Sequence, residues 1–389
     1  MNKKVLFSSI LHFENIKKIK TDSHNILIIY NGGIGDSVLF LSTLSYLVSR
    51  FNVLDQKVFI TGKGFVLDFI KCAEIVGLNY IPLDESKYLN KYSYFKSKNR
   101  ELSSFSFIKV FSFHDSRFSA LISRNISCKN KYGMVLKYLS KKDHILGFLD
   151  FIGYTKKISP QNELGFYFSF QEDMVKAIFI DSEFKASIFG IPEHTSTVHN
   201  QFGNYCTICP TTNEFSKGWE EEKFVEIINF ILINSNLNIV ISAGKEGIGF
   251  IRRFLPKILF PKRIIDMAGK LNYIDWIETI RNSCFCVGND SSAAHIAAST
   301  NVKYIAITSG FCYGTDMPYP GNDSRNPICV YTKEKMNCFD CYYRYGKRGG
   351  KNNKCLESIH KGGKYLCIKT INVEQVISEL PIKQKEGIL

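Results

Sequence analysis

A glycine-rich turn places one carboxylate where a reaction could use it. The run Gly32-Gly33-Ile34-Gly35-Asp36 follows the apolar segment 25–30 and precedes residues whose apolar positions recur at helical spacing. Glycines let a ligand approach the backbone closely, and a carboxylate at this place can accept a proton as a general base. An Asp at a helix start most often only caps the helix, so the turn alone leaves both interpretations open.

Two further segments carry groups that suit a diphosphate. Each follows an apolar run, where a parallel sheet binds ligands at the start of the next helix. Lys217 is a compact cation suited to a phosphate that gains charge as its bond to a sugar breaks. A surface lysine, a capping aspartate and a structural histidine are the alternative interpretations. The candidate groups are Thr211, Thr212, Ser216 and Lys217 in the first segment, and Asp290, Ser291, Ser292 and His295 in the second.

Four cysteines near the C-terminus form a possible metal site. Two residues separate Cys338 from Cys341, which is the spacing of a metal-binding knuckle, and Cys355 and Cys367 follow. Zinc is the default ion for four thiolates, and four unliganded thiols are the alternative. A bound metal would be a structural element of the fold and not a catalyst.

Strands and helices are predicted to alternate in both halves of the chain. In the first half, apolar runs begin at Asn25, Lys57 and Tyr80, with helical patterns between them and a further strand at 106–113. Residues 87–159 otherwise lack clear periodicity. The second half predicts strands at 205–210, 238–244, 263–269, 284–290 and 302–308, helices at 220–234, 247–255, 273–282 and 293–300, and a last helix at 372–380.

Alternation of this kind predicts an α/β protein with two doubly wound parallel sheets. The polar, turn-rich segment 192–203 separates the two runs. We therefore expect an N-terminal domain of residues 1–198 and a C-terminal domain of residues 199–389, which includes the cysteine segment 338–367.

Composition limits the class of protein and of partner. The 389 residues, 45% hydrophobic and 22% charged, suit two globular domains. A formal net charge of +14 favours anionic partners such as nucleotide-sugar phosphates, phosphorylated lipids or nucleic acid. Residues 1–20 resemble mature protein more than a signal peptide, and no run of about 18 apolar residues predicts a membrane span. Twelve cysteines without a signal peptide indicate the cytoplasm.

Taken together, the motifs resemble glycosyltransferase family 9, the heptosyltransferase family, from about residue 25 to residue 380, with a gap at about residues 87–200. The turn ending in Asp36, the Ser-Lys-x-Trp loop at 216–219, the Ala-Gly-Lys at 268–270 and the Gly-Asn-Asp-Ser…His at 288–295 occur in the family's order. Ser292 and Gly218 depart from the family's usual residues, which leaves the donor sugar open. The resemblance implies a GT-B fold, in which two Rossmann-like domains face a central cleft.

The same resemblance implies the roles of the residues. Asp36 and Lys217 would be catalytic, Asp36 as the base and Lys217 as the partner of the departing diphosphate, without a metal ion in the reaction. The donor-binding set would be Gly33, Gly35, Thr211, Thr212, Ser216, Glu246, Asp290, Ser291, Ser292 and His295. Related autotransporter heptosyltransferases use a cysteine cluster to hold iron, so iron joins zinc as a candidate for the four cysteines.

The expected function is inverting transfer of a heptose or related sugar from a nucleotide-diphosphate donor, ADP-heptose first among them. The acceptor would be lipopolysaccharide core, O-antigen or capsule, reached in the cytoplasm or at the inner face of its membrane. Transfer to a protein acceptor is one alternative, which the cysteine cluster favours and the lack of an accessory domain before Asn25 disfavours. A non-catalytic nucleic-acid-binding module is another, but it leaves Asp36 unexplained.

Overall fold

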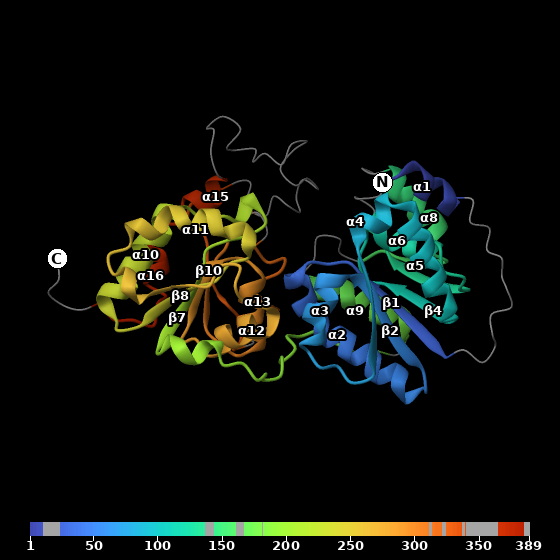
Figure 1. Ribbon diagram of the computed structural model, residues 1–389, viewed down its shortest axis with the longest axis horizontal. Helices are drawn as coiled ribbons and strands as arrows, with labels where there is room; N and C mark the ends of the chain where they lie inside the picture. The colour runs from blue at the N-terminus through green and yellow to red at the C-terminus, as the bar shows by residue number, and fades with distance from the viewer. Residues whose placement is uncertain are drawn as a thin grey trace. The chain divides into compact units, whose positions relative to one another are not determined.

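The computed structural model divides the chain into two compact units, Met1–Ser187 and Ile188–Leu389. It describes residues 1–10, 24–136, 144–160, 167–180, 182–310, 313–320, 324–336, 339 and 365–384. Each unit has one parallel sheet with helices on both faces (Figure 1). The units are taken in turn below.

The first unit contains a six-stranded parallel sheet in the order β3-β2-β1-β4-β5-β6. Its central strand β1 has five consecutive fully buried residues, as expected for a strand covered by helices on both faces. The strands are β1 (Asn25–Tyr30), β2 (Lys57–Lys63), β3 (Leu78–Leu83), β4 (Phe107–Ser112), β5 (Asn130–Met134) and β6 (Lys156–Ile158).

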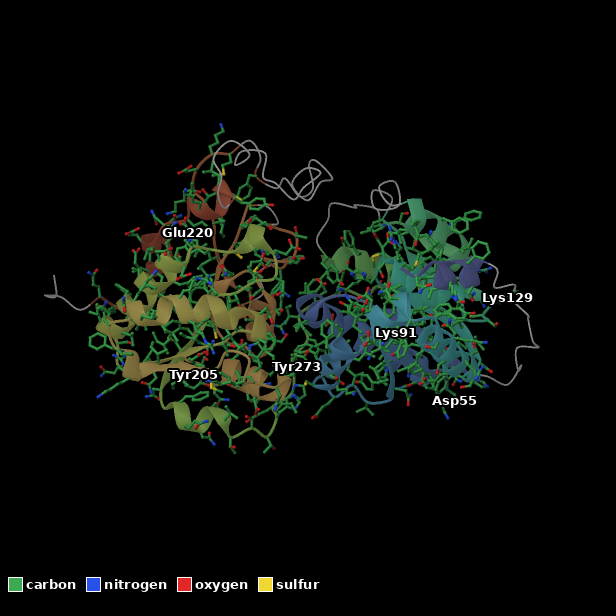
Figure 2. The ribbon with its side chains drawn as sticks, turned by 45° about the horizontal axis from the view of Figure 1, so that its top comes forward. Asp55, Lys91, Lys129, Tyr205, Glu220 and Tyr273 are labelled. Atoms are coloured by element: carbon green, nitrogen blue, oxygen red, sulfur yellow. The ribbon has the colours of Figure 1, made fainter. Side chains whose placement is uncertain are left out.

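Two groups of helices cover this sheet. The long helix α2 packs with α3 and α9, whereas α6 packs with α8 and α4 (Figure 1). Asp55, just beyond α2, has a positive φ of 55° and reverses the chain toward β2 (Figure 2). The helices are α1 (Lys3–Ile10), α2 (Ile34–Val53), α3 (Gly64–Lys71), α4 (Glu85–Asn90), α5 (Tyr92–Ser104), α6 (Arg117–Arg124), α8 (His144–Gly153) and α9 (Tyr167–Ile178).

The second unit repeats the topology. Its parallel sheet has the order β12-β11-β10-β7-β8-β9, so that β7 and β10 are the central pair. All five residues of β7 and all four of β10 are buried. The strands are β7 (Tyr205–Cys209), β8 (Asn238–Ile241), β9 (Ile264–Asp266), β10 (Cys286–Asn289), β11 (Tyr304–Ile307) and β12 (Ile328–Val330).

Helices α10 and α16 pack together in the second unit, and α12 packs with α13 (Figure 1). Tyr205 at the start of β7 donates from its hydroxyl to the carbonyl of Thr279, 2.8 Å away, and so joins the sheet to α12 (Figure 2). The α-helices are α10 (Glu221–Asn234), α11 (Ile248–Phe254), α12 (Tyr273–Arg281), α13 (Ser292–Ser299), α15 (Leu366–Lys369) and α16 (Val373–Ile377). Short 3-10 helices are η1 (Val198–Phe202), η2 (Phe215–Lys217), η3 (Lys245–Gly247), η4 (Leu255–Lys257) and η5 (Pro261–Arg263).

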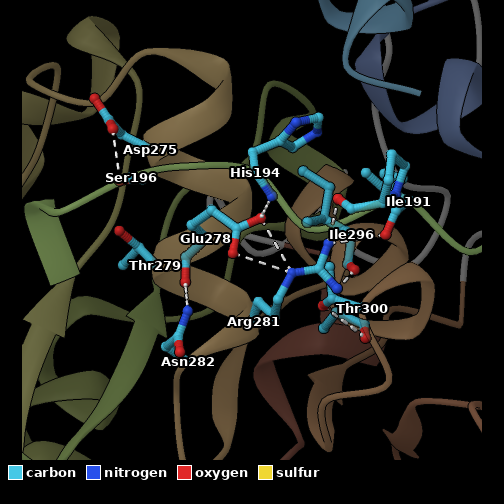
Figure 3. Close-up of polar contacts among 12 residues, drawn as sticks. Ile191, His194, Ser196, Asp275, Glu278, Thr279, Arg281, Asn282, Ile296 and Thr300 are labelled. Atoms are coloured by element: carbon cyan, nitrogen blue, oxygen red, sulfur yellow. Dashed lines mark hydrogen bonds and ion pairs between the residues drawn. The ribbon is translucent and has the colours of Figure 1, made fainter. Parts of the chain in front are cut away.

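The segment that enters the second unit is held by Glu278 and Arg281 of α12 (Figure 3). Arg281 donates to the carbonyls of Ile191 and Pro192 at 2.8 and 2.7 Å, and its Nε lies 3.1 Å from both Glu278 carboxylate oxygens. Glu278 also accepts from the His194 N–H at 3.0 Å. Residues 188–198, assigned to the N-terminal domain from the sequence, therefore pack with the second unit.

The elements follow the predicted alternation, with differences at their ends. The helical pattern after β2 continues to Val76, but α3 ends at Lys71, before Glu74 and Gly77 adopt positive φ. The last helix is five residues long and not nine, since α16 covers Val373–Ile377. Residues 87–159 contain three of the six strands of the first sheet: β4, which confirms the strand predicted at 106–113, and β5 and β6, which were not predicted.

None of the helices that the structure describes is long and apolar enough to cross a membrane.

Candidate active site

Both sheets have a point at which the strand order reverses, and the candidate residues lie there. In the first sheet β1 is flanked by β2 and β4, and in the second β7 is flanked by β8 and β10. Successive connections leave such strands toward opposite faces, so a crevice opens beyond their carboxyl ends. The glycine turn follows β1, the Lys217 loop follows β7, and Asp290 follows β10.

Asp36 lies in the first turn of α2 and caps it. Its Oδ2 accepts a hydrogen bond from the Gly33 N–H at 2.8 Å, and Gly33 is the N-cap residue. The Gly33 carbonyl in turn accepts from the hydroxyl of Ser37. Asp36 thus caps the helix, as one of the two interpretations predicted, and its partly exposed carboxylate is held in one orientation by the turn. Gly35 lies beside it in the same helical turn.

Tyr30 is a neighbour of Asp36 that the sequence analysis did not select. A Cβ atom on Gly32 would lie 2.5 Å from the Tyr30 hydroxyl oxygen and 2.9 Å from Asp36 Cβ, so only glycine fits between them. The Tyr30 hydroxyl lies 3.1 Å from that of Tyr167. Burial, with Tyr167 and Asp36 nearby, raises the pKa of Tyr30 well above its ordinary value. In the sequence, Tyr30 is the last residue of the apolar run 25–30 and resembles an ordinary buried strand residue. The pattern therefore gave no sign that it lies beside Asp36.

In the second unit, the structure brings Lys217 and Asp290 together. Lys217 Nζ lies 3.0 Å from Asp290 Oδ2 and 3.4 Å from Asp316 Oδ2. The Asp290 side chain is 1% exposed and that of Lys217 14%. A buried carboxylate requires a cation or several donors, and Lys217 supplies the charge. Asp316 was not predicted, because it lies in an irregular segment that gives no periodic signal.

Asn289 fixes the two loops to each other. Its Oδ1 accepts from the Trp219 N–H at 3.0 Å, and its Nδ2 donates to the Pro210 carbonyl at 2.7 Å. The Asn289 carbonyl accepts from the Tyr304 hydroxyl at 3.0 Å, and burial raises the pKa of Tyr304, so that it remains a donor. Fully buried, Asn289 spans β10 and both ends of the Lys217 loop. It therefore fixes the loop that carries Lys217 relative to the end of β10, where Asp290 lies.

Gly288, just before Asn289, permits the close approach of β7. A Cβ atom there would lie 2.2 Å from the Cys209 carbonyl oxygen and 2.5 Å from the Tyr304 hydroxyl. Any side chain would push β7 and β10 apart at their carboxyl ends, where Lys217 and Asp290 meet.

Helix α13 begins directly after Asp290. Ser291 is its N-cap residue without a side-chain cap hydrogen bond, and both Ser291 and Ser292 are half-exposed. One turn into the helix, His295 Nδ1 lies 2.8 Å from the Tyr319 hydroxyl and its side chain is 4% exposed. The structure thus gives His295 a buried hydrogen-bond partner, while the two serines remain at the helix N-terminus, where anions are favoured.

The remaining predicted residues lie around the same edge. Thr211 packs on Gly247, where a Cβ atom would lie 2.8 Å from its methyl group. Thr212 accepts from the Glu214 N–H at 3.3 Å, and Ser216 is buried. Glu246 belongs to η3, which follows β8, and its carboxylate folds back over Gly244.

Of the four cysteines, only Cys367 lies within the described residues, and Cys338, Cys341 and Cys355 lie outside them. Cys367 is buried at the start of α15, with its Sγ 3.5 Å from the Ser309 hydroxyl. A Cβ atom on Gly310 would lie 2.7 Å from the Phe339 ring and 3.2 Å from Cys367 Cβ. Phe339, the one described residue of the segment 338–341, thus lies beside Gly310. The described residues contain no group of three or more potential ligands for a metal.

Comparison with known proteins agrees with the motifs. Residues 176–346 match the family model of glycosyltransferase family 9 (heptosyltransferase), which confirms the resemblance over that range. The matched range includes the Lys217 loop, Asp290 and His295, but not the turn with Asp36. No curated protein matches the chain.

Solved structures show the fold. A family 9 glycosyltransferase from Veillonella parvula is 14% identical, covers 91% of this chain and 95% of its own, and superposes with a TM-score of 0.68. The ADP-heptose lipopolysaccharide heptosyltransferase II of E. coli is 13% identical over 91% and 96% of the two chains, with a TM-score of 0.61. The iron-containing dodecameric glycosyltransferase TibC of E. coli is 14% identical over 92% and 77%, with a TM-score of 0.54. The predicted class of two doubly wound GT-B sheets is confirmed.

Proposed function

We propose that this chain, which carries a glycosyltransferase family 9 domain at residues 176–346, transfers a heptose or related sugar from ADP or another nucleotide diphosphate with inversion at the anomeric carbon. An acceptor oxygen forms the new bond to that carbon, while the bond to the diphosphate oxygen breaks and the nucleotide leaves. Structures of E. coli heptosyltransferase WaaC with ADP-2-deoxy-2-fluoro heptose and of TibC with ADP-D-β-D-heptose support this choice of donor.

The contact between Lys217 and Asp290 carries the proposal for the donor. It lies at the carboxyl ends of β7 and β10, and the N-terminus of α13 begins one residue later. A lysine ammonium has three N–H donors, so it can serve its carboxylates and a phosphate oxygen together. Since Asp290 and Asp316 already neutralise Lys217, a leaving diphosphate would be stabilised by the lysine N–H groups together with the partial positive charge at the N-terminus of α13, without a metal ion. Thr211, Thr212, Ser216, Glu246, Ser291, Ser292 and His295 complete the proposed donor site.

Asp36 is the proposed base. Its carboxylate would take the proton of the acceptor hydroxyl as that oxygen attacks the sugar. The hydrogen bond from Gly33 fixes one oxygen of the carboxylate, and the side chain remains partly exposed at the carboxyl end of β1. A fixed orientation with partial exposure suits a base that must meet a hydroxyl from outside the protein.

The proposed acceptor is lipopolysaccharide core, O-antigen or capsule, at the inner face of the cytoplasmic membrane. One surface supports a peripheral contact. Ile145, Phe148 and Phe151 lie three residues apart on α8 and are 38%, 43% and 70% exposed, and Lys157 Nζ lies 4.7 Å from the centre of the Phe151 ring. Apolar side chains flanked by lysines suit an anionic bilayer.

Transfer to a protein acceptor is the second candidate. It is favoured by the four-cysteine set Cys338, Cys341, Cys355 and Cys367, of which Cys367 is buried. The four cysteines would hold a structural zinc or iron ion. That ion would fix the segment 338–367 in the fold, and the transfer steps assigned above would use other residues.

The test is a transfer assay with a purified Asp36→Asn variant and, as its control, Asp68→Asn, which removes an exposed carboxylate from α3. With ADP-heptose as donor and isolated bacterial core oligosaccharides as acceptors, we expect Asp36→Asn to lose about 10²–10⁴-fold in turnover, the range for a general base. ADP binding, followed by calorimetry, should stay within about twofold of the unmodified protein. Loss of ADP binding together with turnover would assign Asp36 to the fold and not to the reaction.

A further inference from the structure

The first unit contains a cavity of about 600 Å³ beside the carboxyl ends of β2 and β3. Its wall begins where β2 ends at Lys63 and where β3 ends at Leu83, and Tyr94 of α5 closes one side. The size is in the range of roughly 300–1,000 Å³ that is usual for small-molecule sites. None of its lining residues was selected from the sequence.

One part of the wall is apolar and accessible. Phe65, in the first turn of α3, is 52% exposed, and Pro82 of β3 lines the same cavity. An exposed aromatic ring costs solvation free energy unless a partner covers it. The electron-rich face of such a ring attracts positively polarised C–H groups, which one face of a pyranose ring presents.

Another part of the wall is polar and already ordered. Lys63 Nζ lies 3.2 Å from Glu85 Oε2, with the two side chains 25% and 33% exposed. The Tyr94 hydroxyl accepts from the Asp84 N–H at 2.9 Å. An ammonium, a carboxylate and a phenol on one rim can donate to and accept from sugar hydroxyls, and bonds with charged partners are the stronger ones.

The charges of the wall disfavour an anion. Among the described residues that line the cavity, Lys63 is the one cation, and Glu85 neutralises it. Asp84 adds a second carboxylate, whose oxygens bind the N–H and the ammonium of Lys87. Each of these carboxylates is thus paired with a lysine, and a phosphate or carboxylate ligand would gain little net attraction in the cavity.

The cavity is connected to the turn that carries Asp36. Asn31, which precedes the turn and is 3% exposed, donates from Nδ2 to Glu85 Oε1 at 3.4 Å and to the Ser116 hydroxyl at 3.2 Å. Within the described residues, its Oδ1 is buried without a hydrogen-bond partner. Glu85 thus lines the cavity on one side and touches the base of the turn on the other.

We propose that this cavity binds an uncharged pyranose ring of the acceptor glycan, with the ring stacked on Phe65 and its hydroxyls bound by Glu85, Lys63 and Tyr94. That the bound sugar belongs to an acceptor rests on the proposed transferase function. Binding of a pyranose in the cavity does not depend on that function. The net charge of +14 predicted an anionic acceptor. This subsite selects a neutral sugar within such an acceptor.

The experiment is saturation-transfer difference NMR on the full chain with methyl β-D-glucopyranoside, methyl β-D-galactopyranoside and methyl α-D-mannopyranoside. Glucose 1-phosphate and glucuronate serve as charged counterparts. We expect ring-proton saturation for at least one neutral glycoside and a weaker signal for both anions. Phe65→Ala and Glu85→Gln should each raise the dissociation constant about tenfold, whereas Phe260→Ala, which removes an aromatic ring that is 45% exposed in the second unit, should leave it unchanged.

Three outcomes would overturn the site: no saturation of any neutral glycoside at high millimolar concentration, stronger binding of the anions, or equal binding by Phe65→Ala. Because Phe65 is half-exposed, its variant should keep the thermal midpoint, which checks folding. Calorimetry with ADP on the same samples separates the two proposals. Glycoside binding without ADP binding would refute the transferase and leave the cavity site standing, and weaker ADP binding by Phe65→Ala would assign the cavity to the nucleotide.

Discussion

At the scale of single residues, the decisive arrangement is a lysine held by two carboxylates at the end of a buried strand. Lys217 has Asp290 at 3.0 Å and Asp316 at 3.4 Å. Since the Asp290 side chain is 1% exposed, its charge depends on that ammonium. The lysine is therefore needed for the fold as well as for the proposed donor site, and a single substitution would mix the two effects.

A double variant separates them. Lys217→Ala should lower the free energy of unfolding by about 3–5 kcal/mol, because it leaves a buried carboxylate without its cation. Lys217→Ala with Asp290→Asn should recover most of that loss, since no charge then remains at the buried position. ADP binding should stay about 10–100-fold weaker in both, if the ammonium binds phosphate. Urea unfolding and calorimetry measure the two quantities.

Lys257→Ala is the matched control, because Lys257 is an exposed lysine of the second unit that pairs with Glu221 and Glu222 at the surface. It should change neither quantity by more than about 0.5 kcal/mol. Recovery of ADP binding together with stability in the double variant would show that Lys217 has only a structural role.

The sequence identified Lys217 and Asp290 but not the residues that hold them. Lys217 and Asp290 each follow an apolar run, and a parallel sheet brings the ends of such runs to one edge. Asp316 and Tyr319 belong to a segment without regular secondary structure, so no periodicity predicts where their side chains lie. Tyr30 was concealed for another reason, since an aromatic residue at the end of a buried strand resembles core.

At the scale of elements, how well an element could be predicted depended on how much of it is buried. Strands β7 and β10 are buried throughout and β1 is buried after Asn25, and all three gave clear apolar runs. Helix α5 has thirteen residues but buries only Phe95 and Leu102, and β6 has three residues with none fully buried. Such elements are stabilised by their neighbours and carry little pattern of their own, which is why α5 and β6 were not predicted, whereas the strand predicted at 106–113 is β4.

One helix also determines how the chain enters the second unit. Arg281 of α12 binds two carbonyls of the entering segment and Glu278, which is 1% exposed (Figure 3). Arg281→Gln should destabilise this unit by about 3 kcal/mol, because the carbonyls and the buried carboxylate lose one shared partner. It should also speed limited proteolysis within residues 188–198, since their attachment to α12 is weakened.

Arg253→Gln is the comparison for this prediction, because Arg253 is 62% exposed and pairs with Glu221 on the surface. Its proteolysis pattern should match that of the unmodified protein. An Arg281→Gln protein cleaved at the same rate would mean that the other contacts of the segment, such as the Ile191 N–H to the Ser299 carbonyl, hold it alone.

At the scale of the whole molecule, the chain uses one topology twice and places different chemistry at the two points of strand reversal. The first sheet ends there in a glycine turn with a carboxylate, and the second ends in a lysine, an aspartate and a helix N-terminus. In the proposed function, the first supplies the proton acceptor and the second binds the diphosphate, which are the two groups that a sugar transfer from a diphosphate needs. The alternation in the sequence was sufficient to predict two doubly wound sheets, because the inner βαβ steps leave the same apolar signature, but it did not predict the strands β5, β6 and β12.

The net charge of +14 is also a property of the whole molecule, and we expect it to attract the protein to anionic membranes, with the α8 surface as the part that contacts them. We expect the protein to sediment with vesicles that contain phosphatidylglycerol and much less with neutral vesicles, and added salt should weaken the binding. Phe148→Ser with Phe151→Ser should reduce binding to the anionic vesicles at least tenfold, because both exposed rings are lost from the apolar face. Val76→Ser, which removes an isolated side chain that is 88% exposed, should have no effect. Equal binding by the double variant and the unmodified protein would show that charge alone, and not α8, determines any contact with the membrane.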